Sequence, residues 1–333
     1  MLDMPEVLSR YAERIEARLR AEVAPEPGYP FLSEPAWYAF EGGGKRLRPT
    51  LCLAATEALG GDPETAIPFA VATEIFHNVL LIHDDIEDGD TMRRDKPTLW
   101  VQAGLPNAIN VSDLLICKVF QLITETPVEP AVRLELCSSF CLAFERTVEG
   151  QALDINLRGH QDVTLETYLR IVQLKTAYYL ALPWVGGALI AGVPSADIAP
   201  LWELGRCLGP AFQIKDDLLD LTQGKGRGGE VGCDLKEGKP SIFFAYVLDR
   251  EAGAADERRR LGEIVRQPRE STSEEDVRWA IDFYHRSGAI PFAESEAQGL
   301  IQRSSDVLEE SPFSPEGKEA FRAISRYIID RST

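Results

Sequence analysis

Positive charge is scarce in this sequence of 333 residues. Lysine and arginine together number 35, against 53 aspartate and glutamate residues, and the formal net charge is −18. A general nucleic-acid-binding protein needs a basic face, and electrostatic attachment to anionic lipid needs clustered Lys and Arg. The charge balance argues against both classes, so any anion that the protein binds must be met by a local group of basic residues.

Long apolar runs are also lacking. No stretch of about 18 consecutive apolar residues occurs, so no transmembrane span is expected. The N-terminal stretch MLDMPEVLSRYAERIEARLR has the pattern of a charged amphipathic helix without the apolar core of a signal peptide. The chain is nevertheless 44% hydrophobic, which is ample for the core of an ordinary globular protein.

Cysteines are scattered without the spacing of a metal site. The six are Cys52, Cys117, Cys137, Cys141, Cys207 and Cys233. Cys137 and Cys141 lie four apart in a helical pattern, and we expect both to pack in the core, as free cysteines commonly do. Free cysteines are typical of a reducing compartment, which predicts a cytoplasmic location.

Strand-like alternation does not persist anywhere, and nearly every segment has the helical period of 3.6 residues. Asp62 and Pro63 have the pattern of an N-cap and first helical residue, and they begin a helix that continues to about Asp88. Pro183 should kink one of the other helices. Those other helices are expected near 3–24, 45–60, 106–125, 129–157, 164–193, 196–223, 239–250, 272–303 and 315–330. The pattern predicts an all-α fold in one domain, residues 1–333.

Carboxylates gather at two places. HDDIEDGD (83–90) places Asp84 and Asp88 four residues apart on one helical face, with Asp85 beside them. We expect Glu87 to face solvent, and Asp90 to do the same or to pair with a nearby arginine. QIKDDLLD (213–220) repeats the spacing with Asp216, Asp217 and Asp220. Either cluster alone is equally well explained as a solvated helix end, but two clusters that each follow an apolar stretch favour sites for hard divalent cations.

Basic residues occur at matching places. GGGKRLRP (42–49) supplies Lys45, Arg46 and Arg48 after three glycines, which let a backbone approach a phosphate closely. TMRRDKP adds Arg93 and Arg94, which alternatively form surface pairs with Asp88 and Asp90 of little energetic value. Taken singly, Lys175 and Lys239 are unremarkable, and His77 has the pattern of a core histidine.

Together these motifs resemble the trans-prenyl diphosphate synthase family, the polyprenyl synthetases. The markers stand in family order over about residues 40–250: GGGKRLRP, FHNVLLIHDDIEDGDTMRRDKPT, EGQALDI, KTAYYL, FQIKDDLLD and GCDLKEGKPS. The resemblance implies an isoprenoid-synthase-type helical bundle with a central active-site cavity, usually as a homodimer. It implies isopentenyl diphosphate and an allylic diphosphate (dimethylallyl, geranyl or farnesyl) as substrates. It also implies three Mg²⁺ ions per active site, with Mn²⁺ as a substitute.

The resemblance also assigns roles to residues. By it, Asp84, Asp85, Asp88 and Asp216 bind magnesium, supported by Asp217 and Asp220. The allylic diphosphate meets Arg93, Lys175, Gln213 and Lys239, and isopentenyl diphosphate meets Lys45, Arg48, His77 and Arg94. Thr176 and Phe212 shape the surroundings of the allylic cation. Catalysis is thereby assigned to Asp84, Asp85, Asp88, Asp216 and Lys175, which promote ionisation of the allylic C–O bond.

Three positions depart from the family pattern. Asp95 and Ser112 each stand where glycine is usual, and Gly229 stands where lysine is usual. Lys225 or Arg227 is then expected to reach the allylic diphosphate instead of a lysine at 229. The departures put one diphosphate contact in doubt and leave the fold expectation unchanged.

Val79 and Leu80 precede Asp84 by five and four residues, where family members set product length sterically. Their intermediate size favours a product of about twenty carbons, geranylgeranyl diphosphate, with farnesyl or longer polyprenyl diphosphates as alternatives. A class I terpene cyclase is a rival interpretation, although it has no need for the second diphosphate site. A non-catalytic subunit of a hetero-oligomer is another, although such subunits often lose aspartates that are intact here.

Overall fold

The computed structural model describes residues 4–25, 29–44, 46–94, 96–160, 163–222 and 231–330. These residues are helical apart from turns, loops and one antiparallel pair of two-residue strands, β1 (Met92–Arg93) and β2 (Lys96–Pro97). The all-α class predicted from the sequence is therefore confirmed. The chain forms two compact units, and each is described here by itself. The expectation of one domain over residues 1–333 stays a prediction.

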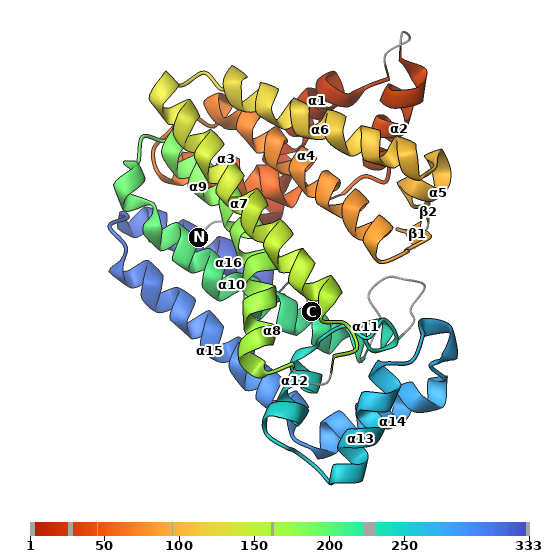
Figure 1. Ribbon diagram of the computed structural model, residues 1–333. Helices are drawn as coiled ribbons and strands as arrows, with labels where there is room; N and C mark the ends of the chain where they lie inside the picture. Colours follow the sequence, from red (N-terminus) through yellow and green to blue (C-terminus); the bar gives the residue numbers. More distant parts are fainter. Residues whose placement is uncertain are drawn as a thin grey trace. The chain divides into compact units, whose positions relative to one another are not determined.

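Unit 1 comprises Met1–Ala143, Tyr179–Trp202 and Leu308–Tyr327. Its helices are α1 (Met4–Val23), α2 (Pro30–Glu41), α3 (Leu47–Ala58), α4 (Pro63–Glu87), α5 (Leu99–Ala103), α6 (Leu105–Glu125), the first part of α7 (Pro130–Asn156), most of α9 (Tyr178–Ile190), the short η2 (Ser195–Asp197) and most of α16 (Pro315–Asp330). The long helix α4 packs against both α3 and α6 (Figure 1).

The helix α4 is the core helix of unit 1. Asp62 caps it as the sequence predicts, because the Asp62 side chain accepts a hydrogen bond from the Glu64 N–H at 3.0 Å and Pro63 is the first helical residue. Among the described helices, α4 alone is long and apolar enough to cross a membrane by length and composition, and 72% of that window is buried inside the structure. Such burial is what a core helix shows.

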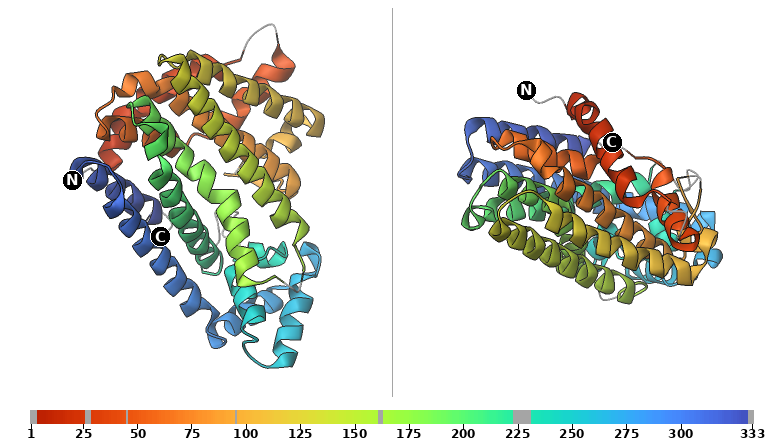
Figure 2. Two further views of the ribbon diagram at one scale, coloured as in Figure 1. Left: turned by 60° about the vertical axis from the view of Figure 1, so that its left-hand side comes forward. Right: turned by 90° about the horizontal axis from the view of Figure 1, so that it is seen from above.

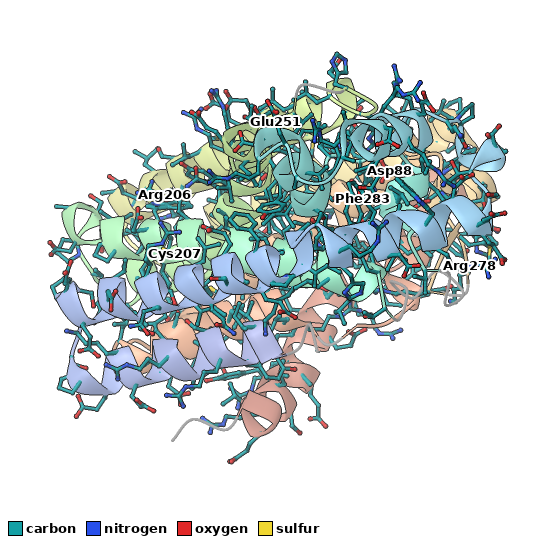
Figure 3. The ribbon with its side chains drawn as sticks, turned by 90° about the horizontal axis from the view of Figure 1, so that it is seen from below. Asp88, Arg206, Cys207, Glu251, Arg278 and Phe283 are labelled. Carbon is teal, nitrogen blue, oxygen red and sulfur yellow. The ribbon has the colours of Figure 1, made fainter. Side chains whose placement is uncertain are left out.

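Unit 2 comprises Phe144–Tyr178, Glu203–Val307 and Ile328–Thr333. Besides the end of α7, its helices are α8 (Leu165–Val172), the π turn η1 (Gln173–Ala177), most of α10 (Ala199–Asp220), α11 (Cys233–Lys236), α12 (Ile242–Asp249), α13 (Ala255–Val265), η3 (Arg269–Ser271), α14 (Glu274–Arg286) and most of α15 (Ala289–Glu310). The helices α13 and α14 pack side by side (Figure 2). Phe283 of α14, labelled in Figure 3, is fully buried.

Several expected helices differ in detail from the observed ones. The helix expected over 272–303 is two helices, α14 and α15, because Gly288 adopts a left-handed φ of +82° between them. The helix expected over 164–193 is interrupted by the π turn η1, whereas α9 continues through Pro183. The helices α2, α5, α11 and α13 were not predicted.

The expectation that Cys137 and Cys141 pack in the core is wrong. Cys141 is exposed and Cys137 is half-buried, because a four-residue spacing places both on one face of a helix without making that face the buried one. Cys52, Cys207 and Cys233 are buried.

Candidate active site

The first acidic cluster lies at the C-terminal end of α4 in unit 1. The side chain of Asp84 is 27% exposed and that of Asp85 is 7% exposed. Asp88, labelled in Figure 3, is the C-cap of the helix. Its N–H donates to the Asp84 carbonyl at 2.8 Å. The cluster therefore combines two half-exposed carboxylates four residues apart with one that is turned into the protein.

Arg93 pairs with this cluster. Its Nε donates to Oδ1 of Asp85 at 2.6 Å, and its Nη2 lies 3.9 Å from Oδ2 of Asp84. Burial raises the pKa of Asp85 to about 6, although the Arg93 guanidinium opposes the rise and the carboxylates of Asp90 and Asp84 add to it. The Arg93 guanidinium thus does not fully offset the cost of burying the Asp85 carboxylate. An additional cation would stabilise its charged form.

Replacing Asp85 by asparagine should raise the unfolding temperature of the metal-free protein at pH 8. Because the folded-state pKa is above the ordinary 3.8, Asp85 contributes most stability below pH 3.8, and the contribution is lost as the pH rises through about 6. The shift corresponds to roughly 3 kcal/mol of unfolding free energy. Thermal scans from pH 4 to pH 8 check this, since the advantage of Asp85→Asn should grow with pH; an advantage independent of pH would contradict it.

The other two acids of HDDIEDGD behave differently from each other. Glu87 is exposed, as expected. The expectation that Asp90 faces solvent is wrong, because Asp90 is only 6% exposed. Its carbonyl accepts hydrogen bonds from Oγ1 of Thr98 and Nε1 of Trp100, both at 2.8 Å, which fix the chain after α4.

Three basic or aromatic side chains meet elsewhere in unit 1. The Arg48 guanidinium lies over the Tyr179 ring at 4.8 Å, and the His77 ring lies parallel to that ring with centroids 6.4 Å apart. Nε of Arg48 is buried and has no hydrogen-bond partner. The structure thus brings together Arg48 and His77, two of the residues expected to hold one diphosphate. Tyr179, whose ring both contact, belongs to the quoted KTAYYL motif but was not predicted as a site residue.

Arg94 lies beside the glycine loop of GGGKRLRP. Its Nη1 donates to the Gly43 carbonyl at 2.8 Å, and Gly43 has a left-handed φ of +64° that favours glycine. Lys45 lies outside the described residues, as do Asp95, Lys225, Arg227 and Gly229. Ser112 is buried in α6, where its hydroxyl donates to the Ala108 carbonyl at 3.0 Å, so this departure from glycine is accommodated within the helix.

The two residues expected to set product length differ in their surroundings. Val79 is fully buried in the core, whereas Leu80 is half-buried one turn before Asp84 on the same face of α4. His77, Leu80, Asp84 and Asp88 follow one another at spacings of three and four, and all are half-exposed. This stripe is therefore the face of α4 that the core leaves open.

The second acidic cluster lies at the end of α10 in unit 2. Asp217 and Asp220 are buried, whereas Gln213, Phe212 and Asp216 are half-buried. Oδ1 of Asp217 accepts from Nε2 of Gln213 at 3.0 Å, and its Oδ2 accepts from the Tyr168 hydroxyl at 2.8 Å. Burial, followed by the charge of Asp217, raises the pKa of Tyr168 and keeps it a donor. Asp216 is thus the most accessible carboxylate of this cluster.

The expected ligand Lys175 lies in the π turn η1 with the buried Thr176. Its Nζ donates to Oδ2 of Asp154 at 2.9 Å, and Asp154 also pairs with Arg158 at 3.3 Å. Single π turns within helices are frequent at functional sites. Asp154 was not predicted as a site residue, although it belongs to the EGQALDI motif.

Lys239 follows α11 in unit 2. Its Nζ lies 2.6 Å from Oε2 of Glu237 and 4.0 Å from Oδ1 of Asp234. The Asp234 N–H donates to Oδ2 of Asp220 at 3.2 Å. This short chain of contacts links Lys239 to the second acidic cluster.

The donor chemistry of both clusters fits Mg²⁺. Carboxylate oxygens are its preferred protein ligands, and it typically takes one or two of them and completes its octahedron with water and substrate phosphate. The described part of the chain contains no group of three or more His, Cys, Asp or Glu side chains that could hold a metal ion. The buried Asp85 next to the half-exposed Asp84, with Arg93 in contact with both, is the arrangement that fits an added cation best.

Comparison with known proteins agrees with the helical fold and the acidic motifs. The polyprenyl synthetase family matches residues 29–284. The short chain isoprenyl diphosphate synthase of Methanothermobacter thermautotrophicus is 34% identical over 99% of both chains. The geranylgeranyl diphosphate synthase of Saccharolobus solfataricus is 32% identical over 90% of both. The solved geranylgeranyl pyrophosphate synthetase from Pyrococcus horikoshii superposes with a TM-score of 0.87, at 31% identity, over 98% of this chain and 99% of that one.

These matches and the all-helical fold define the class as the isoprenoid synthases of the helical type. The chain belongs to the polyprenyl synthetase family, and it is a trans-prenyltransferase of the isoprenyl diphosphate synthase kind. The family implies isopentenyl diphosphate and an allylic diphosphate as substrates, and its members generally depend on Mg²⁺.

Proposed function

We propose that this prenyltransferase elongates an allylic diphosphate with isopentenyl diphosphate and releases geranylgeranyl diphosphate. The observation that supports elongation is the group formed by Arg48, Tyr179 and His77, basic and aromatic side chains that are distinct from the carboxylates and that we assign to a second diphosphate. Two of the relatives named above carry geranylgeranyl in their own names, which supports the product length.

The residues then have distinct tasks. Asp84, Asp85, Asp88 and Asp216 would hold Mg²⁺, three ions per active site with Mn²⁺ as a substitute, and Asp217 and Asp220 support them. When bound, the metal supplies Lewis-acid neutralisation of the charge that grows on the leaving diphosphate. Arg93, Lys175, Gln213 and Lys239 bind and orient the allylic diphosphate, whereas Lys45, Arg48, His77 and Arg94 bind isopentenyl diphosphate.

The chemistry needs no dedicated side-chain base. The allylic C–O bond breaks with both electrons leaving on the diphosphate, and the double bond of isopentenyl diphosphate attacks the allylic carbon to form the new C–C bond. The proton lost from the adjacent carbon passes to the departing diphosphate. Lys175 and Arg93 contribute charge that is preorganised for the leaving group, and Thr176 and Phe212 line the surroundings of the cation.

Arg93 is engaged before any substrate arrives, since it pairs with Asp85 and Asp84. We propose that Asp84 and Asp85 would hold the cation, and that the Arg93 guanidinium would then be available to the diphosphate. Lys175 is held in the same way by Asp154. The basic residues assigned to the allylic diphosphate are therefore kept in place by carboxylates in the free protein.

One experiment tests the function as a whole. The purified protein is incubated with Mg²⁺, isopentenyl diphosphate and, separately, dimethylallyl, geranyl or farnesyl diphosphate, and the products are identified by mass. Longer linear diphosphates are expected, with the twenty-carbon product dominant. Hydrocarbons or alcohols would instead indicate cyclisation, and the absence of any product at high enzyme concentration would indicate a non-catalytic subunit.

Replacing Leu80 by phenylalanine should shorten the product. Leu80 is half-buried on the open face of α4 one turn before Asp84. The larger phenylalanine side chain would therefore leave less room for the growing chain. Product masses from dimethylallyl or geranyl diphosphate as primer check this, and Leu80→Ala is the matched variant that should lengthen the product. An unchanged product distribution in both variants would show that Leu80 does not limit the chain. Val79 is assigned a smaller part because it is fully buried.

We further propose a homodimer that pairs through α6 and the first part of α7. Ile109 and Phe120 of α6 and Leu134 of α7 are exposed, at 49%, 38% and 70%, and Cys141 of α7 is exposed as well. Burying such an apolar surface against its copy is favourable. Light scattering tests this against the 36.9 kDa of one chain. We also propose that the protein is cytoplasmic.

A further inference from the structure

Arg46 has an unusual conformation for its position. It precedes α3 as the N-cap residue, with a left-handed φ of +45° and ψ of +44°, and it is only 8% exposed. The left-handed conformation is energetically unfavourable for a residue with a Cβ, and a buried guanidinium needs hydrogen-bond or ion-pair partners. Specific contacts must therefore hold both the backbone and the side chain of Arg46 in place.

Those contacts come from three helices. Nε of Arg46 lies 3.2 Å from Oε2 of Glu16 on α1, and Nη1 donates to Oε1 of Glu74 on α4 at 3.1 Å. Nη2 donates to the Phe40 carbonyl near the end of α2 at 3.4 Å. One side chain thus ties α1, α2 and α4 to the start of α3.

This engagement changes the interpretation of Arg46. The sequence places it among the basic residues of GGGKRLRP that are suited to an anion, yet two carboxylates and a carbonyl surround its guanidinium. The Glu74 side chain is 7% exposed and thus as buried as its partner, so the pair is screened little by water. An incoming diphosphate would meet the two carboxylates at this place, and Arg46 is therefore not its ligand.

The surroundings of the pair give it a different role. Glu74 lies three residues before His77 on α4, and Arg48 lies two residues after Arg46 in the first turn of α3. Arg48 and His77 meet at the ring of Tyr179. The Arg46–Glu74 pair therefore joins α3 to α4 about one turn from the two side chains that must act together on one diphosphate.

We propose that Arg46 and Glu74 are a positioning pair for isopentenyl diphosphate. The pair fixes the start of α3 against α4, and it thereby sets the separation of Arg48 from His77 without touching the substrate. The proposal rests on the proposed function, since it takes Arg48 and His77 as ligands of that diphosphate.

The test uses a double variant, Arg46→Met with Glu74→Met. Removing one partner leaves a buried charge unpaired and destabilises the protein, whereas replacing both by apolar side chains of similar volume is often neutral. The KM for isopentenyl diphosphate should rise about tenfold to a hundredfold, because small displacements of binding groups have effects of that size. The KM for the allylic diphosphate should change less than about twofold, and the unfolding temperature should stay near that of the wild type.

Two controls make the outcome decisive. Glu41→Gln removes an exposed carboxylate at the same loop, and both KM values should stay unchanged. Arg48→Ala tests the proposed function itself: if its KM for isopentenyl diphosphate is normal, the assignment of the diphosphate site fails, whatever the pair does. If Arg48→Ala raises that KM and the double variant does not, only the positioning proposal fails.

Other outcomes also decide the question. A double variant that raises both KM values equally would show that the pair has a general structural role, and the proposal would be overturned. Where the double variant does not fold, Arg46→Lys carries the same test, since it keeps the charge and can reach one carboxylate but not three acceptors. It should show a smaller rise confined to isopentenyl diphosphate, and equal rises for both substrates would again overturn the proposal.

Discussion

Replacing Asp84 by alanine is expected to lower kcat/KM on the order of a thousandfold, the effect of removing one main source of charge stabilisation from a reaction of this kind. Asp84 lies at the open end of α4, four residues before Asp88, and its side chain is 27% exposed. When Asp84 is lost, Arg93 keeps its closer contact with Asp85 at 2.6 Å. The variant should therefore fold normally and fail in catalysis.

The matched control is Glu87→Ala. Glu87 carries the same charge in the same turn of α4, but it is exposed. Its removal should leave kcat/KM within about twofold of the wild type, as is usual for a surface change. Steady-state rates and Mg²⁺ titration followed by the shift in unfolding temperature check both variants. Near-normal activity of Asp84→Ala, or equal losses in the two variants, would rule out Asp84 as a metal ligand.

The sequence predicts local features well, because these depend on neighbours within one or two turns. The cap at Asp62, the course of α4 and the grouping of Asp84, Asp85 and Asp88 all follow from helical spacing. The same holds for the second cluster on α10. The break at Gly288 was missed because both sides of it have helical period, so periodicity alone gave one long helix.

Contacts between distant segments were harder to predict. Arg46 is separated from Glu16 by 30 residues and from Glu74 by 28, and no local pattern distinguishes an arginine that turns inward from one that faces an anion. A signal did exist at Glu74, which is a carboxylate within the apolar run of α4 and needs a buried partner. The expectation that Asp90 faces solvent failed for the same reason, since its carbonyl is fixed by Thr98 and Trp100, whose positions depend on the fold after α4. Its alternative, a pair with a nearby arginine, stays a prediction.

Close packing of α7 and α10 against the π turn η1 helps to hold Lys175 in place. On one side, a Cβ added to Gly150 of α7 would lie 2.3 Å from the backbone nitrogen of Lys175. On the other, a Cβ added to Gly209 of α10 would lie 2.6 Å from the Ala177 Cα. Real Cβ atoms do not approach backbone so closely, so the two glycines allow α7 and α10 to hold η1 between them. The EGQALDI motif thus supplies both the space at Gly150 and the carboxylate of Asp154 that binds Lys175.

Replacing Gly150 by alanine should therefore destabilise the protein strongly and displace Lys175. Overpacking of a core typically costs 1–3 kcal/mol, and about 3 kcal/mol is expected here because the obstruction is backbone rather than a flexible side chain. The KM for the allylic diphosphate should rise in the folded fraction, while that for isopentenyl diphosphate stays nearly constant. Thermal unfolding and substrate titrations measure the two effects, and Gly209→Ala should act in the same direction.

Gly299→Ala is the control that separates packing from helix propensity. Gly299 also lies inside a helix of unit 2, α15, but an added Cβ meets nothing within 4 Å. Alanine in a helix interior is more favourable than glycine by roughly 0.5–1 kcal/mol, so Gly299→Ala should raise the unfolding temperature. The same substitution is thus expected to have opposite signs at two positions of one unit. If Gly150→Ala were as stabilising as Gly299→Ala, the close packing of η1 against α7 would be wrong, and with it the account of how Lys175 is held.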